Sequence, residues 1–539
     1  MAPPLRPAVS PAVPLSQVAA CGGTAAPDIP EAWEHVLVTG VTLDSRSVRK
    51  GDLYAALPGA LAHGADFAGQ AVGAGASAVL TDPAGARRLG ATRGLDGIPV
   101  LAVPDPRAVL GAVAAAVYGR PGADLLLLGV TGTNGKTTTA YLLDSALRAL
   151  GRTTGMIGTV ETRIAAQRWP SVRTTPESTD VHALLAVMRE RGVQACTMEV
   201  SSHALALHRV DGVLFDVAGF TNLSRDHLDF HGTMEQYYAA KAELFTPLRS
   251  SRGVVCVDDA WGERLARESS VPVETVTSAV PGGADWWLEP AAPGDARFTL
   301  RSASGGTALR LRSALPGEFN RVNTALAAVM LLACDIPAAD VQSALEADPH
   351  VPGRMERVDA GVPGQPLAVV DFAHTADAVA SVLVALRGTT RGRLVVVLGA
   401  GGDRDRGKRA QMGRSAVEHA DAVVVTDDNP RSEDPAAIRA QLIAGMPAEV
   451  RTATPAAAGR RVVLEVAGRA DAIRRAVSLT SGPEDTVVVV GKGHETGQEV
   501  AGTVHPFDDR AELRAALQCL RRRGSTVTDG STVADGGPS

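Results

Sequence analysis

The chain has 539 residues, of which 45% are apolar and 21% charged, and its net charge is −6 with histidine neutral. This composition predicts a soluble globular protein of two to four domains. The negative charge and an aromatic content of only 4% argue against nucleic-acid binding, which relies on basic surfaces and stacking rings. The five cysteines form no C-x-x-C pair, which favours reduced thiols, a cytoplasmic protein and no zinc site.

The two ends of the chain differ in composition from the rest. Residues 1–38 are predicted to be a loose tail and lead-in, because the first twenty are rich in Pro and Ala and lack the apolar core of a signal peptide. Residues 521–539 are rich in Gly, Ser, Thr and Asp and are predicted to be a disordered tail. No membrane insertion is expected, because every apolar run is far shorter than the ~20 residues of a spanning helix.

Residues 39–121 form the first predicted domain. Short apolar runs at 53–57, 78–80 and 100–103 alternate with Gly- and Ala-rich stretches of helical character. This alternation predicts a small α/β domain.

The second predicted domain, residues 122–353, opens with a phosphate-binding pattern. The apolar run 125–128 leads into a glycine-rich loop, after which Lys136 and Thr137 begin a helix. In such a loop the backbone N–H groups face the phosphates of ATP, the lysine reaches the β- and γ-phosphates and the hydroxyl binds Mg²⁺. Val130 stands where the strict P-loop pattern has glycine, but three other glycines still permit the turn. The alternative is an ordinary strand-to-helix turn with an incidental lysine.

The rest of this domain repeats the strand–turn–helix pattern. Apolar runs at 194–200 and 215–220 each end in a polar turn, and a β-rich stretch at 297–311 precedes a predicted helix at 320–333. Strands that alternate with helices predict a mostly parallel sheet.

Three polar side chains near the predicted strand ends point to a metal site. Glu199 ends one strand and His227 follows the next, so both could join Thr137 around one or two Mg²⁺ ions. A histidine taken alone is more often structural.

Lys241 lies in the predicted helix 237–245, where the ordinary interpretation is a solvated lysine. If it is buried, it would lose its proton readily and could react with CO₂ to become an anionic metal ligand.

The third predicted domain, residues 354–520, contains four apolar runs that each end in a polar cluster. The runs lie at 367–370, 394–398, 422–425 and 486–490. In open parallel sheets, ligands bind beyond the carboxyl ends of the strands. The four polar ends therefore predict one binding surface on a Rossmann-like α/β domain.

Four motifs in this order carry a family resemblance: Gly132–Thr138, Met198–His203, Thr221–Asp229 and Asp428–Arg431. The chain resembles the Mur ligases of peptidoglycan synthesis from about residue 39 to residue 517. The resemblance implies a small N-terminal uridine-nucleotide domain, a central P-loop ATPase-type domain and a C-terminal amino-acid-binding domain. It also implies an ATP-dependent monomeric enzyme that uses Mg²⁺ and adds meso-2,6-diaminopimelate to UDP-N-acetylmuramoyl-L-alanyl-D-glutamate (UDP-MurNAc-L-Ala-D-Glu) through an acyl phosphate.

Carried over by position, the resemblance implies three sets of binding residues and one catalytic set. The UDP-sugar peptide would meet Leu43, Ser45, Thr174, Thr175, Ser201 and Arg209. ATP would meet Gly132, Thr133, Asn134, Gly135, Lys136, Thr137, Thr138, Asn320, Asn323 and Arg354. The diamino acid would meet Arg404, Asp428, Asn429, Pro430, Arg431, Gly491 and Glu495. Catalysis would depend on Lys136, His227 and Lys241, and Mg²⁺ on Thr137, Glu199, His227 and carbamylated Lys241.

The predicted diamino-acid residues also have a physical rationale. Arg431, with Arg404 opposite, suits bidentate capture of the distal carboxylate, and Glu495 could pair with the distal ammonium. L-Lysine lacks that carboxylate, so diaminopimelate is the preferred acceptor.

The alternative functions are a ligase of the same fold that adds L-lysine or extends a folate, a P-loop NTPase switch, and a non-catalytic scaffold. Three positions depart from the family pattern, namely Leu207, Phe372 and Ala376.

Overall fold

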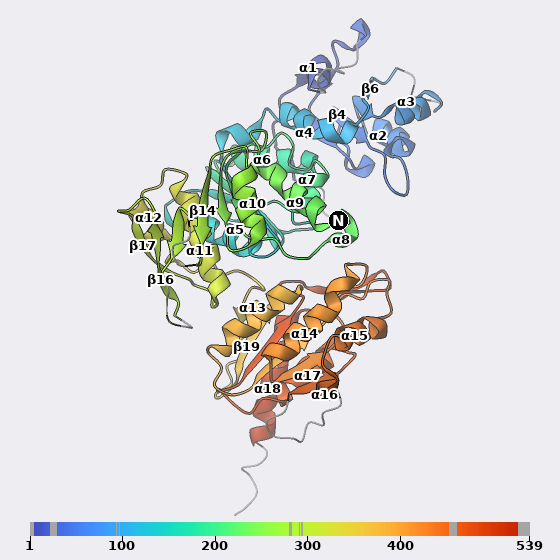
Figure 1. Cartoon of the computed structure of the whole chain (residues 1–539). Coiled ribbons are helices and arrows are strands. Elements are labelled where there is room, and N and C mark those ends of the chain that lie inside the picture. Colours follow the sequence, from blue (N-terminus) through green and yellow to red (C-terminus); the bar gives the residue numbers. More distant parts are fainter. Residues whose placement is uncertain are drawn as a thin grey trace, which may run out of the picture.

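The computed structural model describes residues 5–21, 30–92, 94–95, 97–279, 283–289, 292, 295–451 and 461–525. Three α/β units follow one another along the chain, and Figure 1 shows them in a row from the blue N-terminal part through the green and yellow centre to the orange and red C-terminal part. Each unit has its own sheet. The largest sheet of each unit lies inside one of the three predicted ranges, although the division at residues 121 and 353 itself stays a prediction.

The N-terminal sheet has four parallel strands in sequence order. They are β3 (Gly40–Thr42), β4 (Asp52–Ala56), β5 (Ala78–Thr81) and β6 (Val100–Ala102). The helices are α2 (Ala68–Gly73), α3 (Pro83–Gly90) and α4 (Pro106–Val117). Helix α4 begins where the sequence favours a start, because the Asp105 carboxylate accepts two backbone N–H bonds and proline occupies the first helical position.

The prediction of a loose N-terminal tail is wrong for residues 5–21. Strand β1 (Val13–Pro14) pairs with β2 (Leu37–Val38), and helix α1 (Leu15–Ala20) buries Leu15 and Val18 in the core of the N-terminal unit. Arg6 forms a buried ion pair with Asp52 at 2.6 Å. A few well-spaced apolar residues were enough to anchor a segment whose composition suggested disorder.

The central sheet has eleven strands, in the order β10-β9-β8-β11-β7-β12-β13-β14-β15-β16-β17. From β8 to β15 all neighbours are parallel, and antiparallel strands lie at both edges. This confirms the predicted mostly parallel sheet. The bounds are β7 (Leu126–Thr131), β8 (Thr154–Ile157), β9 (Glu161–Ile164), β10 (Gln167–Pro170), β11 (Ala195–Glu199), β12 (Phe215–Phe220), β13 (Ser250–Cys256), β14 (Val273–Thr277), β15 (Trp286–Leu288), β16 (Arg297–Ser302) and β17 (Ala308–Arg312).

Helices cover both faces of this sheet, so its strands are buried on both sides. One apolar core lies under α5 (Lys136–Ala149) and α11 (Glu318–Leu332), and a second lies under α6 (Ser178–Glu190) and α9 (Met234–Ala242). The remaining helices are α7 (Ser202–Ala206), α8 (Leu228–His231), α10 (Ala260–Glu268) and α12 (Ala338–Ala344).

The C-terminal sheet has the order β18-β19-β23-β20-β21-β22 and is parallel apart from β18. Its strands are β18 (Glu356–Arg357), β19 (Leu367–Asp371), β20 (Leu394–Leu398), β21 (Ala422–Val425), β22 (Val462–Glu465) and β23 (Thr486–Val490), followed by the hairpin β24 (Gly497–Val500) and β25 (Thr503–Pro506). The helices are α13 (Ala376–Arg387), α14 (Arg409–His419), α15 (Pro435–Ala444), α16 (Ala448–Arg451), α17 (Arg469–Ser478) and α18 (Asp509–Ser525). This confirms the predicted α/β fold class of the third unit.

The predicted C-terminal tail begins too early. Helix α18 continues to Ser525, so residues 521–525 are helical, and the rest of the predicted tail lies outside the described residues. None of the described helices combines the length and the apolarity needed to cross a bilayer.

Candidate active site between the central and C-terminal units

The predicted phosphate loop connects β7 to α5 at the carboxyl edge of the central sheet. Gly132 and Gly135 both have positive φ, at +142° and +90°. A side chain at Gly132 would collide with the Thr221 hydroxyl, and one at Gly135 would come within 2.5 Å of the Asn323 amide oxygen. Glycine is therefore required at both positions, and the backbone turns tightly ahead of the α5 N-terminus.

Two lysines converge on this loop. The Lys136 ammonium donates to the carbonyl oxygens of Gly132 and Thr133, both at 2.9 Å, and Lys241 donates to the Gly132 carbonyl at 2.7 Å. Burial lowers the pKa of both amines, and the Lys136 charge lowers the pKa of Lys241 further, to well below its usual value. Lys241 is only 1% exposed and its Nζ lies 4.8 Å from the centre of the Tyr237 ring. The neutral amine that CO₂ would attack is therefore favoured at Lys241.

Glu199 lies fully buried at the end of β11, beside the start of α5. Its carboxylate accepts from the Thr137 hydroxyl at 2.8 Å and from the Thr159 backbone N–H at 2.7 Å. Arg354, from the chain that leads into the C-terminal unit, donates to the Thr137 hydroxyl at 2.9 Å. A buried carboxylate and a hydroxyl are the hard oxygen ligands that Mg²⁺ prefers, so these residues fit the implied metal. Among the described residues, no three His, Cys, Asp or Glu side chains alone form a metal site, so phosphate oxygens and a carbamate would have to complete it.

His227 precedes α8 in a left-handed conformation, with φ of 55°. Its ring packs edge-on against His203 at 4.9 Å and against Tyr237 at 6.1 Å between centroids. Burial lowers the pKa of His227 to about 3. The imidazole is therefore neutral at physiological pH, as a metal ligand must be.

The residue before it, Asp226, joins the central and C-terminal units. Its carboxylate accepts from Lys408 at 2.9 Å, and His374 lies 3.5 Å away. Burial alone would raise the pKa of Asp226, but His374, Lys408 and His227 together hold it well below its usual value. Arg225 and Asp405 form a second ion pair across the same boundary at 3.1 Å.

The other predicted ATP residues surround the same loop. Asn323 donates to the Asn320 amide oxygen at 3.2 Å, and Asn134 donates to the Thr375 hydroxyl of the C-terminal unit at 3.4 Å. Thr138 is buried in the first turn of α5. Arg354 lies over the ring of Phe372 at 4.4 Å, so the phenylalanine that departs from the family pattern packs directly against a predicted nucleotide residue.

The predicted peptide-binding residues divide into two places. Thr174, Thr175, Ser201 and Arg209 are close to Glu199: the Thr175 hydroxyl donates to the Glu199 carbonyl at 2.7 Å, and the Thr174 and Thr159 hydroxyls lie 3.0 Å apart. Leu43 and Ser45 follow β3 in the N-terminal unit. Leu43 packs against the core there, and the Ser45 hydroxyl donates to Gln70 at 3.0 Å.

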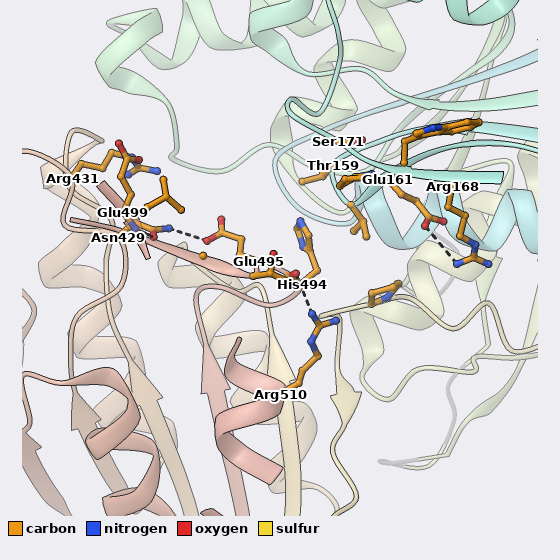
Figure 2. Close-up of a pocket in the computed structure, with 17 residues that line it drawn as sticks. Thr159, Glu161, Arg168, Ser171, Asn429, Arg431, His494, Glu495, Glu499 and Arg510 are labelled. Atoms are coloured by element: carbon orange, nitrogen blue, oxygen red, sulfur yellow. Dashed lines mark hydrogen bonds and ion pairs between the residues drawn. The ribbon is translucent and has the colours of Figure 1, made fainter. Parts of the chain in front are cut away.

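A cavity of about 640 Å³ separates the β9–β10 hairpin from the strand ends of the C-terminal unit, and Figure 2 shows its two walls. Three predicted diamino-acid residues line it, namely Asn429, Arg431 and Glu495. Arg431 donates to the Gly402 carbonyl at 2.7 Å and lies 3.3 Å from Glu499. The Glu495 carboxylate accepts from Asn429 at 2.8 Å and from Lys492 at 2.9 Å, so its charge is already balanced by a neighbour that the sequence did not suggest.

The remaining predicted diamino-acid residues lie at the same edge. A Cβ built on Gly401 would come within 3.0 Å of Arg431 and 3.8 Å of Arg404, so the two arginines flank this glycine. Arg404 is exposed and donates to the Asp403 carbonyl at 2.9 Å. The Pro430 carbonyl lies against Gly402, and Asp428 lies against Gly491, which has φ of +116°.

A phosphate loop with a buried carboxylate, facing a charged cavity on the next unit, defines an ATP-dependent ligase or transferase. The comparisons agree: residues 37–118 match the catalytic domain of the Mur ligase family, residues 130–331 the Mur ligase middle domain, and residues 353–493 the Mur ligase glutamate ligase domain. The chain belongs to the Mur ligase family.

Several relatives are similar over nearly their whole length. The chain is 53% identical over 517 residues to the UDP-N-acetylmuramoyl-L-alanyl-D-glutamate–2,6-diaminopimelate ligase of Streptomyces avermitilis, covering 96% of this chain and 98% of the relative. It is 52% identical to the ligase of the same name from Streptomyces coelicolor, with the same coverage. A solved structure of a ligase of that name superimposes with a TM-score of 0.64 at 30% identity, covering 95% of this chain and 100% of the other.

Several residues of the site were missed by sequence reasoning. Thr159 lies in a turn, and Glu161 begins β9, the second strand from the sheet edge, whose polar sequence gave no strand signal. His494 lies in the stretch 491–495, of which only Gly491 and Glu495 were predicted site residues. Asp226 lies inside the motif Thr221–Asp229 but was given no role, Lys408 lies four residues after Arg404, and only the fold brings the two together.

Proposed function

We propose that this chain is the ATP-dependent ligase that adds meso-2,6-diaminopimelate to UDP-N-acetylmuramoyl-L-alanyl-D-glutamate in peptidoglycan precursor synthesis. The observation that carries the proposal is the cavity between the two units. Its lining runs from Thr159, which is bonded to Glu199 beside the phosphate loop, to Arg431 and Asn429 at the C-terminal strand ends. The names of relatives about half identical over almost their entire length support the same reaction.

In the first step, a carboxylate oxygen of the D-glutamate attacks the γ-phosphorus of ATP. A new O–P bond forms, the bond to the ADP oxygen breaks, and an acyl phosphate and ADP result. Lys136 and the N–H groups of the loop stabilise the charge on the transferring oxygens. Thr174, Thr175 and Arg209 hold the peptide end beside Glu199, as their contacts with the Glu199 region suggest.

In the second step, an uncharged amine of the diamino acid attacks the acyl carbon. The C–N bond forms, the C–O bond breaks, phosphate leaves and the amine proton passes to solvent or phosphate. Arg431 and Asn429 hold the distal amino-acid centre and so present the amine in one orientation. Contacts such as Lys408 with Asp226 keep the two units together, which limits access of water to the acyl phosphate.

Mg²⁺ would be held by Thr137, Glu199, His227 and a carbamylated Lys241. Bound there, it would neutralise charge on the phosphate oxygens. The protein's own contribution is the arrangement already present: the Thr137 hydroxyl bonded to Glu199, and Lys241 buried with a lowered pKa.

We further propose that the protein acts as a cytoplasmic monomer. Its cosubstrates are nucleotides, the described cysteines are all free thiols, and the predicted binding groups of the central and C-terminal units all come from one chain.

The test is ATP-dependent phosphate release with UDP-N-acetylmuramoyl-L-alanyl-D-glutamate as acceptor, comparing meso-diaminopimelate with L-lysine. Turnover with diaminopimelate alone supports the proposal and the role given to Arg431. Turnover with lysine alone would leave the fold and the two steps standing but would refute that role. ATP hydrolysis that needs no amino acid would instead favour a nucleotide switch.

A further inference from the structure

The distal centre of the diamino acid carries a carboxylate and an ammonium group, and the cavity must offer a partner to each. Arg431 is the partner proposed for the carboxylate. The carboxylate predicted to meet the ammonium, that of Glu495, already accepts from Lys492 at 2.9 Å and from Asn429 at 2.8 Å. The Lys492 side chain is 0% exposed, so it stays with Glu495 when a ligand enters. The ammonium therefore needs a carboxylate whose charge becomes available on binding.

Glu499 is a carboxylate of the same wall that lies beside Arg431. It belongs to β24 and lines the cavity, and its Oε2 atom lies 3.3 Å from the Nε atom of Arg431. Figure 2 shows the two side chains next to each other. Among the described residues, Arg431 is the only ion-pair or hydrogen-bond partner of the Glu499 side chain, which is 39% exposed. A partly exposed ion pair of this kind is easily broken.

The backbone, rather than this ion pair, holds the hairpin against the turn that contains Arg431. The Arg431 N–H donates to the Glu499 carbonyl at 3.1 Å, and the Ala501 N–H donates to the Arg431 carbonyl at 2.8 Å. The Glu499 N–H donates to the Asn429 side-chain oxygen at 3.0 Å. Arg431 has φ of +52°, an uncommon conformation for an arginine, which these bonds maintain. The two side chains can therefore change partners while the backbone stays in place.

A substrate carboxylate would bring about that change of partners. The Nη1 atom of Arg431 donates to the Gly402 carbonyl at 2.7 Å, whereas Nη2 makes no hydrogen bond with a described residue and is free to donate to a ligand. A carboxylate that accepts from this guanidinium replaces Glu499 as its anionic partner. In an amino-acid centre, the carboxylate and the ammonium are attached to the same carbon. The group that displaces Glu499 from Arg431 therefore brings a cation to Glu499.

We infer that Glu499 binds the distal ammonium group of meso-diaminopimelate while Arg431 binds the carboxylate of the same centre. This inference rests on the proposed function and adds to it a residue of β24 that selects the acceptor. In the free protein the two side chains pair with each other, and in the complex each pairs with one group of the substrate; no covalent bond is made or broken. L-Lysine brings no distal carboxylate, so Arg431 keeps Glu499 as its partner and the exchange favours diaminopimelate.

The test compares meso-diaminopimelate with L-2-aminopimelate, which keeps the distal carboxylate and lacks the distal ammonium. Because Glu499 is partly exposed, the lower end of the range for a charged hydrogen bond applies, and the wild-type KM should be about tenfold lower for diaminopimelate. Glu499→Gln keeps the size of the side chain and removes its charge. It should raise the KM for diaminopimelate about tenfold and leave the KM for L-2-aminopimelate unchanged or lower. The KM for ATP and the thermal midpoint should not change.

Two outcomes would overturn the inference. An equal rise of KM for both acceptors in Glu499→Gln would mean that Glu499 only orients Arg431. Equal KM values for the two acceptors in the wild type, or a preference that Glu495→Gln abolishes and Glu499→Gln retains, would show that Glu499 does not meet the ammonium.

Glu484→Gln is the matched control. Glu484 is an exposed glutamate just before β23, at the end of the strand away from the cavity, and it lies 4.0 Å from Arg391. Its replacement removes the same charge from a similar pair and should change none of the KM values.

The wild-type reaction distinguishes the two levels of failure. No turnover with diaminopimelate in the wild type would refute the proposed function itself. Normal wild-type turnover with an unaltered KM for diaminopimelate in Glu499→Gln would refute only the role of Glu499.

Discussion

Replacing Lys408 with methionine should lower kcat/KM by weakening the contact between the central and C-terminal units, while leaving nucleotide binding intact. The Lys408 ammonium lies 2.9 Å from the Asp226 carboxylate, and their side chains are 9% and 5% exposed. At an effective dielectric constant of about 20, two unit charges at this distance attract by ~6 kcal/mol, before desolvation offsets part of that energy. Loss of one partner from a buried pair typically costs about 3–5 kcal/mol, because the other charge is stranded.

Here the lower end of that range applies, because His374 remains 3.5 Å from Asp226 and can take over part of the interaction. If the arrangement in which Lys408 contacts Asp226 is destabilised by about 3 kcal/mol, kcat/KM should fall roughly a hundredfold. Steady-state phosphate release measures this fall, and a melting curve checks that the units remain folded. Binding of an ATP analogue to Lys408→Met should be close to normal, since the lysine donates to Asp226 and not to the phosphate loop.

The neighbouring pair of Arg225 and Asp405 provides the matched control. It crosses the same boundary, but Arg225 is 46% exposed, and exposed pairs contribute at most about 1 kcal/mol. Arg225→Gln should therefore reduce kcat/KM by less than about tenfold. If Lys408→Met is no more harmful than Arg225→Gln, the argument that burial makes this contact strong is refuted.

Three further outcomes follow from individual contacts. Arg431→Met should lower kcat/KM for diaminopimelate by about tenfold to a hundredfold through loss of a charged hydrogen bond, while the KM for ATP stays the same; an equal loss for both would refute its assignment. Asp509→Asn should lower the free energy of unfolding by about 3–5 kcal/mol in a denaturant titration, since Arg469 and Asp509 pair at 2.7 Å with both side chains fully buried; a change typical of a surface pair would contradict this. Burial lowers the pKa of His182 from 6.5 to about 4, so the folded state excludes a proton that the unfolded chain binds. Stability is therefore present above about pH 6.5 and falls by up to ~3 kcal/mol as the pH drops towards 4, and melting curves of His182→Asn should lack this dependence.

The central strands could be predicted from the sequence because they are buried on both faces. Strands β12, β20, β21 and β23 begin and end at the predicted residues, since a parallel strand covered by helices is a continuous apolar run bounded by polar residues. The β9–β10 hairpin lies at a sheet edge, and its residues are mostly polar, so no apolar pattern marked it. Helix α1 was missed for a related reason, because only a few apolar residues anchor it.

Within the candidate site, short-range relations were predictable and long-range ones were not. Lys136 and Thr137 follow one another at a helix start, and Glu199 ends an apolar run, so local pattern was enough to suggest them. Lys408 and Asp226 are 182 residues apart, and nothing in either neighbourhood indicates the other. Their contact depends on how two separately folded sheets meet, which periodicity and composition do not encode.

The sequence also could not show which charged side chains of the cavity are already paired with a neighbouring side chain. By position and chemistry Glu495 was a good candidate for an ammonium partner, yet Lys492, three residues before it, neutralises it on the same wall. Affinity for a charged ligand depends on the charge left over after internal pairing, because a carboxylate that already has a close cation gains little from a second one.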